Sequence, residues 1–184
     1  MCEGEVVIML GIKNYNPKFY ADVNDLINNY GDKLRSLIGS TLEDIWTVHE
    51  VSEGEFWADC PVVFVIAGNQ FEFCSFRDRE IAITWNKIDL KEKIDWYGSK
   101  GLNLEWRKNV VRVLVPYINK KIESVEIIEL NEEINVAPSR FLHSPLLLNG
   151  IGFSFDDGYI SVFNAFDETG ISPQRLEKHK YTKV

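Results

Sequence analysis

The chain has 184 residues, a length that suits one domain, or two small half-domains that share a core. Hydrophobic residues make up 45%, charged residues 26% and aromatic residues 12%, which excludes the fibrous, collagen-like and disordered classes. The formal net charge is -8. A surface of this sign repels a nucleic-acid backbone, and no locally basic face overrides it, so nucleic-acid binding is not expected.

Targeting and cofactor signals are missing from the sequence. The cysteines Cys2, Cys60 and Cys74 form no CxxC pair, and their odd number suits a reducing compartment. The first apolar run is too short for a membrane span and lacks a basic leader. Gly150-Ile151-Gly152 lacks the third glycine and the following helix of a dinucleotide fingerprint. We therefore expect a cytoplasmic protein with no membrane contact and no cofactor.

The N-terminal part of the chain predicts a strand followed by a helix. Residues 5–12 are apolar and rich in branched side chains, which indicates a buried strand. Asn16-Pro17 is typical of a helix start. Apolar residues then recur at helical spacing from Phe19 to Tyr30, and Gly31 is expected to end the helix. Residues 32–38 are expected to form a short turn.

From Thr41 onward the hydrophobic period changes to two, which predicts consecutive antiparallel strands. The first group is expected at residues 45–48, 61–67, 70–76, 81–85 and 102–106, with a charged connection at 87–100. A helix is expected at 109–118, interrupted or ended near Pro116. The strands that follow are expected at 121–130, 146–148, 152–155 and 159–163, with a loop at 131–144. Asp156-Asp157-Gly158 is the strongest hairpin signal. The fold class predicted is α+β, a β-rich antiparallel arrangement with a few helices.

Two parts of the chain match each other in order. Residues 34–50 align with 114–130, residues 68–73 with 150–155, and residues 85–89 with 163–167. This pattern favours an internal duplication of a helix-plus-meander unit, with pseudo-repeats at about 30–89 and 110–167. Chance alignment of two alternating patterns is the competing interpretation. The predicted organisation is a single domain over residues 1–170.

The remaining residues, 171–184, are expected to form a basic, flexible tail. They hold Arg175, Lys178, Lys180 and Lys183 against one acid, Glu177, which leaves a formal charge of -11 on residues 1–170. A body this acidic favours solubility and speeds encounter with a basic protein or a cationic ligand.

The main candidate binding site is an acidic loop that contains aromatic residues. Glu53, Glu55 and Asp59 surround Phe56-Trp57. Aromatic side chains dominate binding hot spots, so an aromatic pair with an acidic rim is a candidate anchor for a partner. The alternative is that Phe56 and Trp57 enter the next strand and cover the core.

A second candidate is an apolar pocket between the two halves with few polar groups, lined by Trp46, His49, Trp85 and Asn86. Asn86 with Asp89, and Asn164 with Asp167, follow an aromatic-ended strand in both halves. Such pairs are most often turn caps, although they could also contact a ligand.

No catalytic or metal-ligating residues are assigned. His49, Asp59, Cys60 and His143 are the residues from which a metal site could be built, but they lack ligand spacing. Ser144 or Cys74 paired with His143 or His49 would be a nucleophile with its base, but no nucleophile motif surrounds either residue.

Two segments carry a resemblance to known proteins. They are Trp57 to Val63, which lead into Ile83-Thr84-Trp85-Asn86, and Leu148 to Glu168. Over about residues 34–170 the chain resembles small uncharacterised bacterial proteins, several of which are suspected immunity proteins of toxin loci. The resemblance implies a cytoplasmic, non-enzymatic inhibitor of one cognate toxin. Its motifs are structural, it carries over no functional residue, and the signature positions of the better-known immunity folds are missing.

These observations favour a non-enzymatic binding protein that occludes the basic active site of a toxin. Its carboxylates would speed capture, and its aromatic residues would slow release. The alternatives are a small-molecule-binding or enzymatic domain with a pocket between the halves, and a structural or scaffold subunit. The sequence leaves the oligomeric state open.

Overall fold

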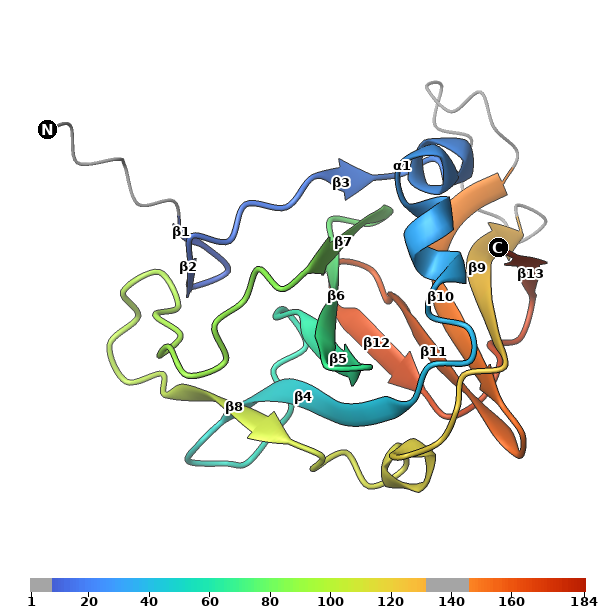
Figure 1. Cartoon of the computed structure of the whole chain (residues 1–184). Coiled ribbons are helices and arrows are strands. Elements are labelled where there is room, and N and C mark those ends of the chain that lie inside the picture. Colours follow the sequence, from blue (N-terminus) through green and yellow to red (C-terminus); the bar gives the residue numbers. More distant parts are fainter. Residues whose placement is uncertain (1–7, 132–145) are drawn as a thin grey trace, which may run out of the picture.

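The computed structural model describes residues 8–131 and 146–184, and over these residues it is β-rich with two large antiparallel sheets and one α-helix. The six-stranded sheet has the order β3-β7-β6-β5-β4-β8, and the five-stranded sheet has the order β12-β11-β10-β9-β13. A short ribbon, β1-β2, precedes them (Figure 1). The predicted α+β class is confirmed.

The strands and helices have well-defined bounds. The first sheet and its ribbon contain β1 Ile8–Met9, β2 Ile12–Lys13, β3 Phe19–Tyr20, β4 Leu42–Glu50, β5 Val62–Ile66, β6 Asn69–Phe76, β7 Glu80–Trp85 and β8 Leu104–Lys108. The helix α1 is Val23–Arg35, and a 3₁₀ turn η1 is Val115–Tyr117. The second sheet contains β9 Ser124–Asn131, β10 Leu146–Phe155, β11 Gly158–Asn164, β12 Thr169–Ser172 and β13 His179–Lys183.

The main core lies between the two sheets. Phe64 and Phe71 of the six-stranded sheet meet Phe153 of β10, with ring centroids 5.4 and 5.5 Å away. Leu26 and Leu34 of α1 join the same cluster, and the helix contacts β9 and β10 at one end of the two sheets (Figure 1). Alternation of apolar residues along each strand places one face of each sheet against this core.

The opposite face of the six-stranded sheet is also covered. Val63, Cys74 and Ala82 point to this side and pack against Leu10 and Tyr15 of the N-terminal segment. Both faces are therefore buried, which is why β5 is a continuous apolar run, whereas β6 alternates Phe71 and Phe73 with the buried Glu72.

A buried carboxylate fastens the connection after β7 to this outer layer. Glu72 is fully buried and accepts hydrogen bonds from the backbone amides of Lys87 (2.6 Å) and Ile88 (2.9 Å) and from the hydroxyl of Thr84. Burial raises the pKa of Glu72, while these donors act in the opposite direction. Glu72 thus anchors the start of the predicted 87–100 connection.

The helix begins later and ends later than the sequence predicts. Phe19 and Tyr20 form β3 at the edge of the sheet, where Phe19 stacks on Phe76 at 4.6 Å. The N-cap is Asp22, whose side chain accepts from the amides of Asn24 and Asp25. Gly31 lies inside the helix and is buried, so it does not act as the terminator.

The helix predicted at residues 109–118 is wrong. The structure has the 3₁₀ turn η1 there instead, with Pro116 in its first turn. Val110, Val111, Val113 and Val115 are β-branched and have poor helix propensity, and Pro116 prevents continuation of an α-helix. The predicted loop at 131–144 falls almost entirely outside the described residues.

The hairpin at Asp156-Asp157-Gly158 is confirmed. Phe155 pairs with Gly158, so Asp156 and Asp157 form the two-residue turn between β10 and β11. A Cβ at residue 158 would collide with the hydroxyl of Tyr117, which explains the glycine by close approach. The strands predicted at 146–148 and 152–155 are one strand, β10, with a register shift between Leu148 and Gly150.

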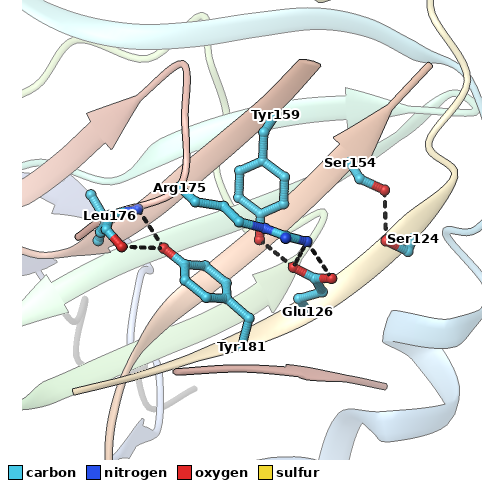
Figure 2. A network of polar contacts seen from close by, with 7 residues as sticks. All are labelled: Ser124, Glu126, Ser154, Tyr159, Arg175, Leu176 and Tyr181. Atoms are coloured by element: carbon cyan, nitrogen blue, oxygen red, sulfur yellow. Dashed lines mark hydrogen bonds and ion pairs between the residues drawn. The ribbon is translucent and has the colours of Figure 1, made fainter. Parts of the chain in front are cut away.

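Residues 171–184 differ from the expected flexible tail. β13 pairs along β9, from His179 opposite Leu130 to Lys183 opposite Glu126. The guanidinium of Arg175 lies over Tyr159 and Tyr181, 4.8 and 5.2 Å from the ring centroids (Figure 2). Its Nη2 is 2.7 Å from the carboxylate oxygens of Glu126, whose side chain is 3% exposed. Arg175 and Lys180 thus pair with buried carboxylates of β9, Glu126 and Glu129.

The predicted internal duplication is not confirmed. Each sheet does contain a four-strand meander followed by a strand that pairs with the first strand of that meander, β8 with β4 and β13 with β9. However, only the first matched segments lie in corresponding strands, β4 and β9, and the later matched residues do not correspond in structure. Gly68 lies in the β5–β6 turn, whereas its predicted counterpart Gly150 lies inside β10.

Candidate functional site

An acidic groove forms where the β4–β5 connection meets the β11–β12 turn. Its volume is about 550 Å³. The sequence-predicted residues Glu53, Glu55, Trp57 and Asp59 all line it, so the structure brings this candidate site together. The remaining lining residues are Glu50, Ser52, Phe56, Ala58, Gly101, Leu102 and Glu168.

Local hydrogen bonds shape the loop that carries these side chains. The amide of Gly54 donates to the carbonyl of Glu50 at 2.9 Å, and the amide of Glu50 donates to the carbonyl of Glu55 at 2.9 Å. Gly54 has φ +73°, a left-handed conformation that favours glycine. The amide of Trp57 then donates to the carbonyl of Val48 at 2.8 Å, which returns the chain to β4. Glu53 and Glu55 are left exposed at the tip of a defined turn.

The carboxylates of the groove differ in their proton affinity. Glu50 accepts hydrogen bonds from the Ser52 hydroxyl (2.6 Å) and the Glu53 amide (2.9 Å), and these donors lower its pKa. Burial, followed by the negative charges of Glu168 and Asp167, raises the pKa of Asp59. Glu50 is therefore stabilised in its charged form, whereas a nearby cation would stabilise the charged form of Asp59.

The aromatic side chains form a wall of the groove and also cover the core. Phe56 packs on the core between the sheets, and its ring centroid is 5.9 Å from that of His49. Trp57 packs edge-on against Trp96 at 5.6 Å. Both Phe56 and Trp57 are half-buried. Both rings thus pack on the protein interior and also line the groove.

The sequence analysis missed the contribution of the second sheet. Glu168 lies in the β11–β12 turn, more than a hundred residues after the acidic loop, and it lines the same groove. The amide of Thr169 donates to the carbonyl of Ala58 at 2.7 Å, which holds the two segments together. No local pattern signals this contact, because it depends on how the sheets pack.

The lining residues within the described chain include no lysine or arginine. Arg107 lies beside the groove loop, since its Nη1 would be 3.8 Å from a Cβ at Gly54. Its Nε is already 2.6 Å from Oε1 of Glu105. The negative charge of the groove is therefore not neutralised by side chains from its own wall.

The structure does not bring the alternative pocket residues together. Trp46 packs on the outer layer of the six-stranded sheet, whereas Trp85 packs on the core between the sheets. The strands that carry them, β4 and β7, are separated by β5 and β6. His49 contacts Thr47 and the carbonyl of Gly54 (2.9 and 3.2 Å), and Asn86 caps a turn by accepting from the amide of Gln70 at 2.8 Å.

The other candidate constellations have structural roles or fall outside the described residues. Cys60 and Cys74 are buried free thiols, and burial raises the pKa of both. His143 and Ser144 lie outside the described residues. Within the described ranges, no group of three or more His, Cys, Asp or Glu side chains could hold a metal ion.

Comparison with protein-family models, with curated proteins and with solved structures found no match for this chain. Among the described residues, no helix has the length and apolar character needed to cross a membrane.

Proposed function

We propose that this chain is a non-enzymatic binding protein that neutralises a basic protein partner, as a cytoplasmic immunity protein neutralises its toxin. The observation that carries the proposal is the acidic groove of about 550 Å³, which combines carboxylates from two sheets with the half-buried Trp57. The mechanism is occlusion: the groove covers cationic side chains that the toxin needs for its own activity.

The groove suits arginine and lysine side chains on physical grounds. A guanidinium pairs with carboxylates through charge-assisted hydrogen bonds and stacks on aromatic rings. Here the carboxylates of Glu53, Glu55 and Asp59 lie beside the indole of Trp57 in one concave surface. The formal charge of -8 adds long-range attraction, which raises the association rate, while contact with Trp57 slows dissociation.

The test compares two variants that lose the same formal charge. The groove variant carries Glu53→Gln, Glu55→Gln and Asp59→Asn. The control variant carries Asp89→Asn, Glu123→Gln and Glu177→Gln, which are exposed acids outside the groove. Each protein is used to capture partners from the native cell, and any captured protein is expressed alone and together with the chain. Titration of the purified pair at two salt concentrations gives the affinities.

We expect one basic protein to bind the wild type and the control variant. The groove variant should bind it at least about 100-fold more weakly, since two or more charge-assisted contacts are lost. Expression of that protein alone should arrest growth, and co-expression with the wild type should restore it. Equal affinity of the two variants would exclude the groove as the interface. A partner that does not harm growth would exclude toxin neutralisation.

A further inference from the structure

The turn between β11 and β12 carries the most exposed large apolar side chain in the described part of the chain. Phe166 is 79% exposed, and the next such residue, Tyr97, is 65% exposed. Hydrophobic stabilisation comes from apolar surface that folding removes from water. A ring that stays in water therefore contributes little to the stability of this fold.

The backbone at Phe166 is also unfavourable for a bulky residue. Phe166 and Asp167 have φ values of +61° and +77°, and the amide of Ala165 donates to the carbonyl of Glu168 at 2.8 Å across them. Two central residues with positive φ define a type I′ turn, in which asparagine and glycine are preferred. Phenylalanine is strained there because its Cβ crowds the backbone, and such strain is frequent at functional sites. The exposed ring and the strained backbone together indicate that Phe166 serves a contact outside this chain.

Hydrogen bonds fix this turn to the six-stranded sheet. The carboxylate of Asp167 accepts from the amide of Arg77 in the β6–β7 turn. The side chain of Asn164 accepts from the amide of Asp167 at 3.1 Å and donates to the carbonyl of Glu80 at 2.9 Å. The ring of Phe166 therefore projects from a support that is held on both sides, so little backbone freedom is lost when a partner binds it.

The turn that carries Phe166 also forms part of the acidic groove. Glu168, two residues later in the chain, lines the groove. Burial raises the pKa of Asp59 in the groove, and the negative charges of Glu168 and Asp167 raise it further, which requires these carboxylates to lie near it. A partner that enters the groove therefore reaches the turn that presents the ring.

We propose that Phe166 is the apolar anchor of this interface and enters an apolar socket on the basic partner, beside the cationic side chains that bind the groove. This inference rests on the proposed function and adds to it the apolar character of the partner's surface. The acids next to the ring, Asp167, Glu168 and Asp59, repel an anionic membrane and a second copy of this acidic chain, so they favour a basic protein as the occupant. Aromatic anchors inside a polar rim are typical binding hot spots.

The first test uses the free chain. Phe166→Asn places a residue that tolerates a left-handed backbone at this position, so the melting temperature should rise by about 2–4 °C. The control is Val113→Asn, because Val113 is 54% exposed and lies outside the groove lining. This variant should not raise the melting temperature. A melting temperature of Phe166→Asn equal to or below that of the wild type would overturn the inference, because the ring would then be free of strain or covered by the chain itself.

The second test uses the purified basic protein that the wild type captures from the native cell. Association and dissociation rates are measured at two salt concentrations. Phe166→Asn should raise the dissociation rate about 30-fold, which is the size of a hot-spot loss. The association rate and its salt dependence should stay unchanged, since no charge is removed. Val113→Asn should bind like the wild type.

The outcomes separate this inference from the proposed function. Equal dissociation rates for Phe166→Asn and Val113→Asn would overturn the anchor and leave the groove as the interface. Normal binding of the groove variant, together with fast dissociation of Phe166→Asn, would support the anchor and exclude the groove. Capture of no basic protein by the wild type would overturn both.

Discussion

Asn164 in the five-stranded sheet donates a hydrogen bond from Nδ2 to the carbonyl oxygen of Glu80 in the six-stranded sheet, at 2.9 Å. The same Nδ2 is 2.8 Å from the carbonyl of Arg77, and Asn164 is 4% exposed. One amide group thus links the end of β11 to the turn between β6 and β7. This contact joins the sheets beside the β11–β12 turn, which contributes Glu168 to the acidic groove.

Asn164→Ala should lower the free energy of unfolding by about 1–3 kcal/mol, because it removes the buried amide that donates to the carbonyl groups of Arg77 and Glu80. Denaturant unfolding measures the change. The control is Asn29→Ala on the exposed face of α1, where the side chain donates to the carbonyl of Asp25 in the same helix. That variant should stay within about 0.5 kcal/mol of the wild type. Similar losses in both would show that the link between the sheets adds little.

Arg175→Ala should destabilise the protein by about 1–3 kcal/mol, since it removes the cation that pairs with the buried Glu126 carboxylate and lies over the rings of Tyr159 and Tyr181. Hydrogen exchange should also become faster in β13, which lies beside this cluster (Figure 2). Arg35→Ala is the control, because its pair with Asp32 is solvent-exposed. Its loss should not exceed about 0.5 kcal/mol. Unchanged exchange in β13 would contradict the role given to Arg175.

Gly152→Ala should cost at least about 2 kcal/mol, because the added Cβ would collide with the hydroxyl of Tyr159. That hydroxyl donates to Glu126 at 2.8 Å, so the network cannot easily move aside. The double variant Gly152→Ala, Tyr159→Ala removes the collision. Its loss should be smaller than the sum of the two single losses, as a double-mutant cycle of unfolding free energies would measure. Additive losses would mean that Gly152 is needed for another reason.

The pKa of Asp59 should be above its ordinary value in the free protein and should fall when a cationic partner binds, because the partner offsets Glu168 and Asp167. Binding therefore releases a proton, and the affinity should weaken as the pH falls through this raised pKa. In the free protein the same shift means that stability falls as the pH rises through that interval. Carboxyl ¹³C NMR follows the titration of Asp59.

The variants Asp59→Asn and Glu168→Gln provide the check. Asp59→Asn should flatten the pH dependence of binding, and Glu168→Gln should lower the pKa of Asp59. A pKa for Asp59 that does not move when Glu168 is neutralised would show that the charge of Glu168 does not contribute to the shift.

Local signals accounted for most of the strands and for the acidic loop. The hairpin turns at Gly68 and at Asp156-Asp157 are marked by the residues that such turns require, and the apolar patterns of the neighbouring segments predict β5, β6, β7 and β11. The helix predicted at 109–118 does not form, because its β-branched residues and Pro116 disfavour an α-helix. The prediction that Phe19 and Tyr20 belong to the helix was wrong for another reason. They form a strand by pairing with β7, which lies about sixty residues later in the chain.

The amino-acid sequence alone accounts for the α+β class, for the strong negative charge and for the grouping of Glu53, Glu55, Trp57 and Asp59, since these follow from short-range periodicity and composition. The addition of Glu168 to the groove, the bulge at Asn149 and the return of 179–183 to the sheet came from the tertiary structure. These features involve residues that are far apart in the chain, or depend on the register between two strands. Both are determined by how the apolar faces of the sheets pack together. Local sequence preferences therefore do not predict these contacts.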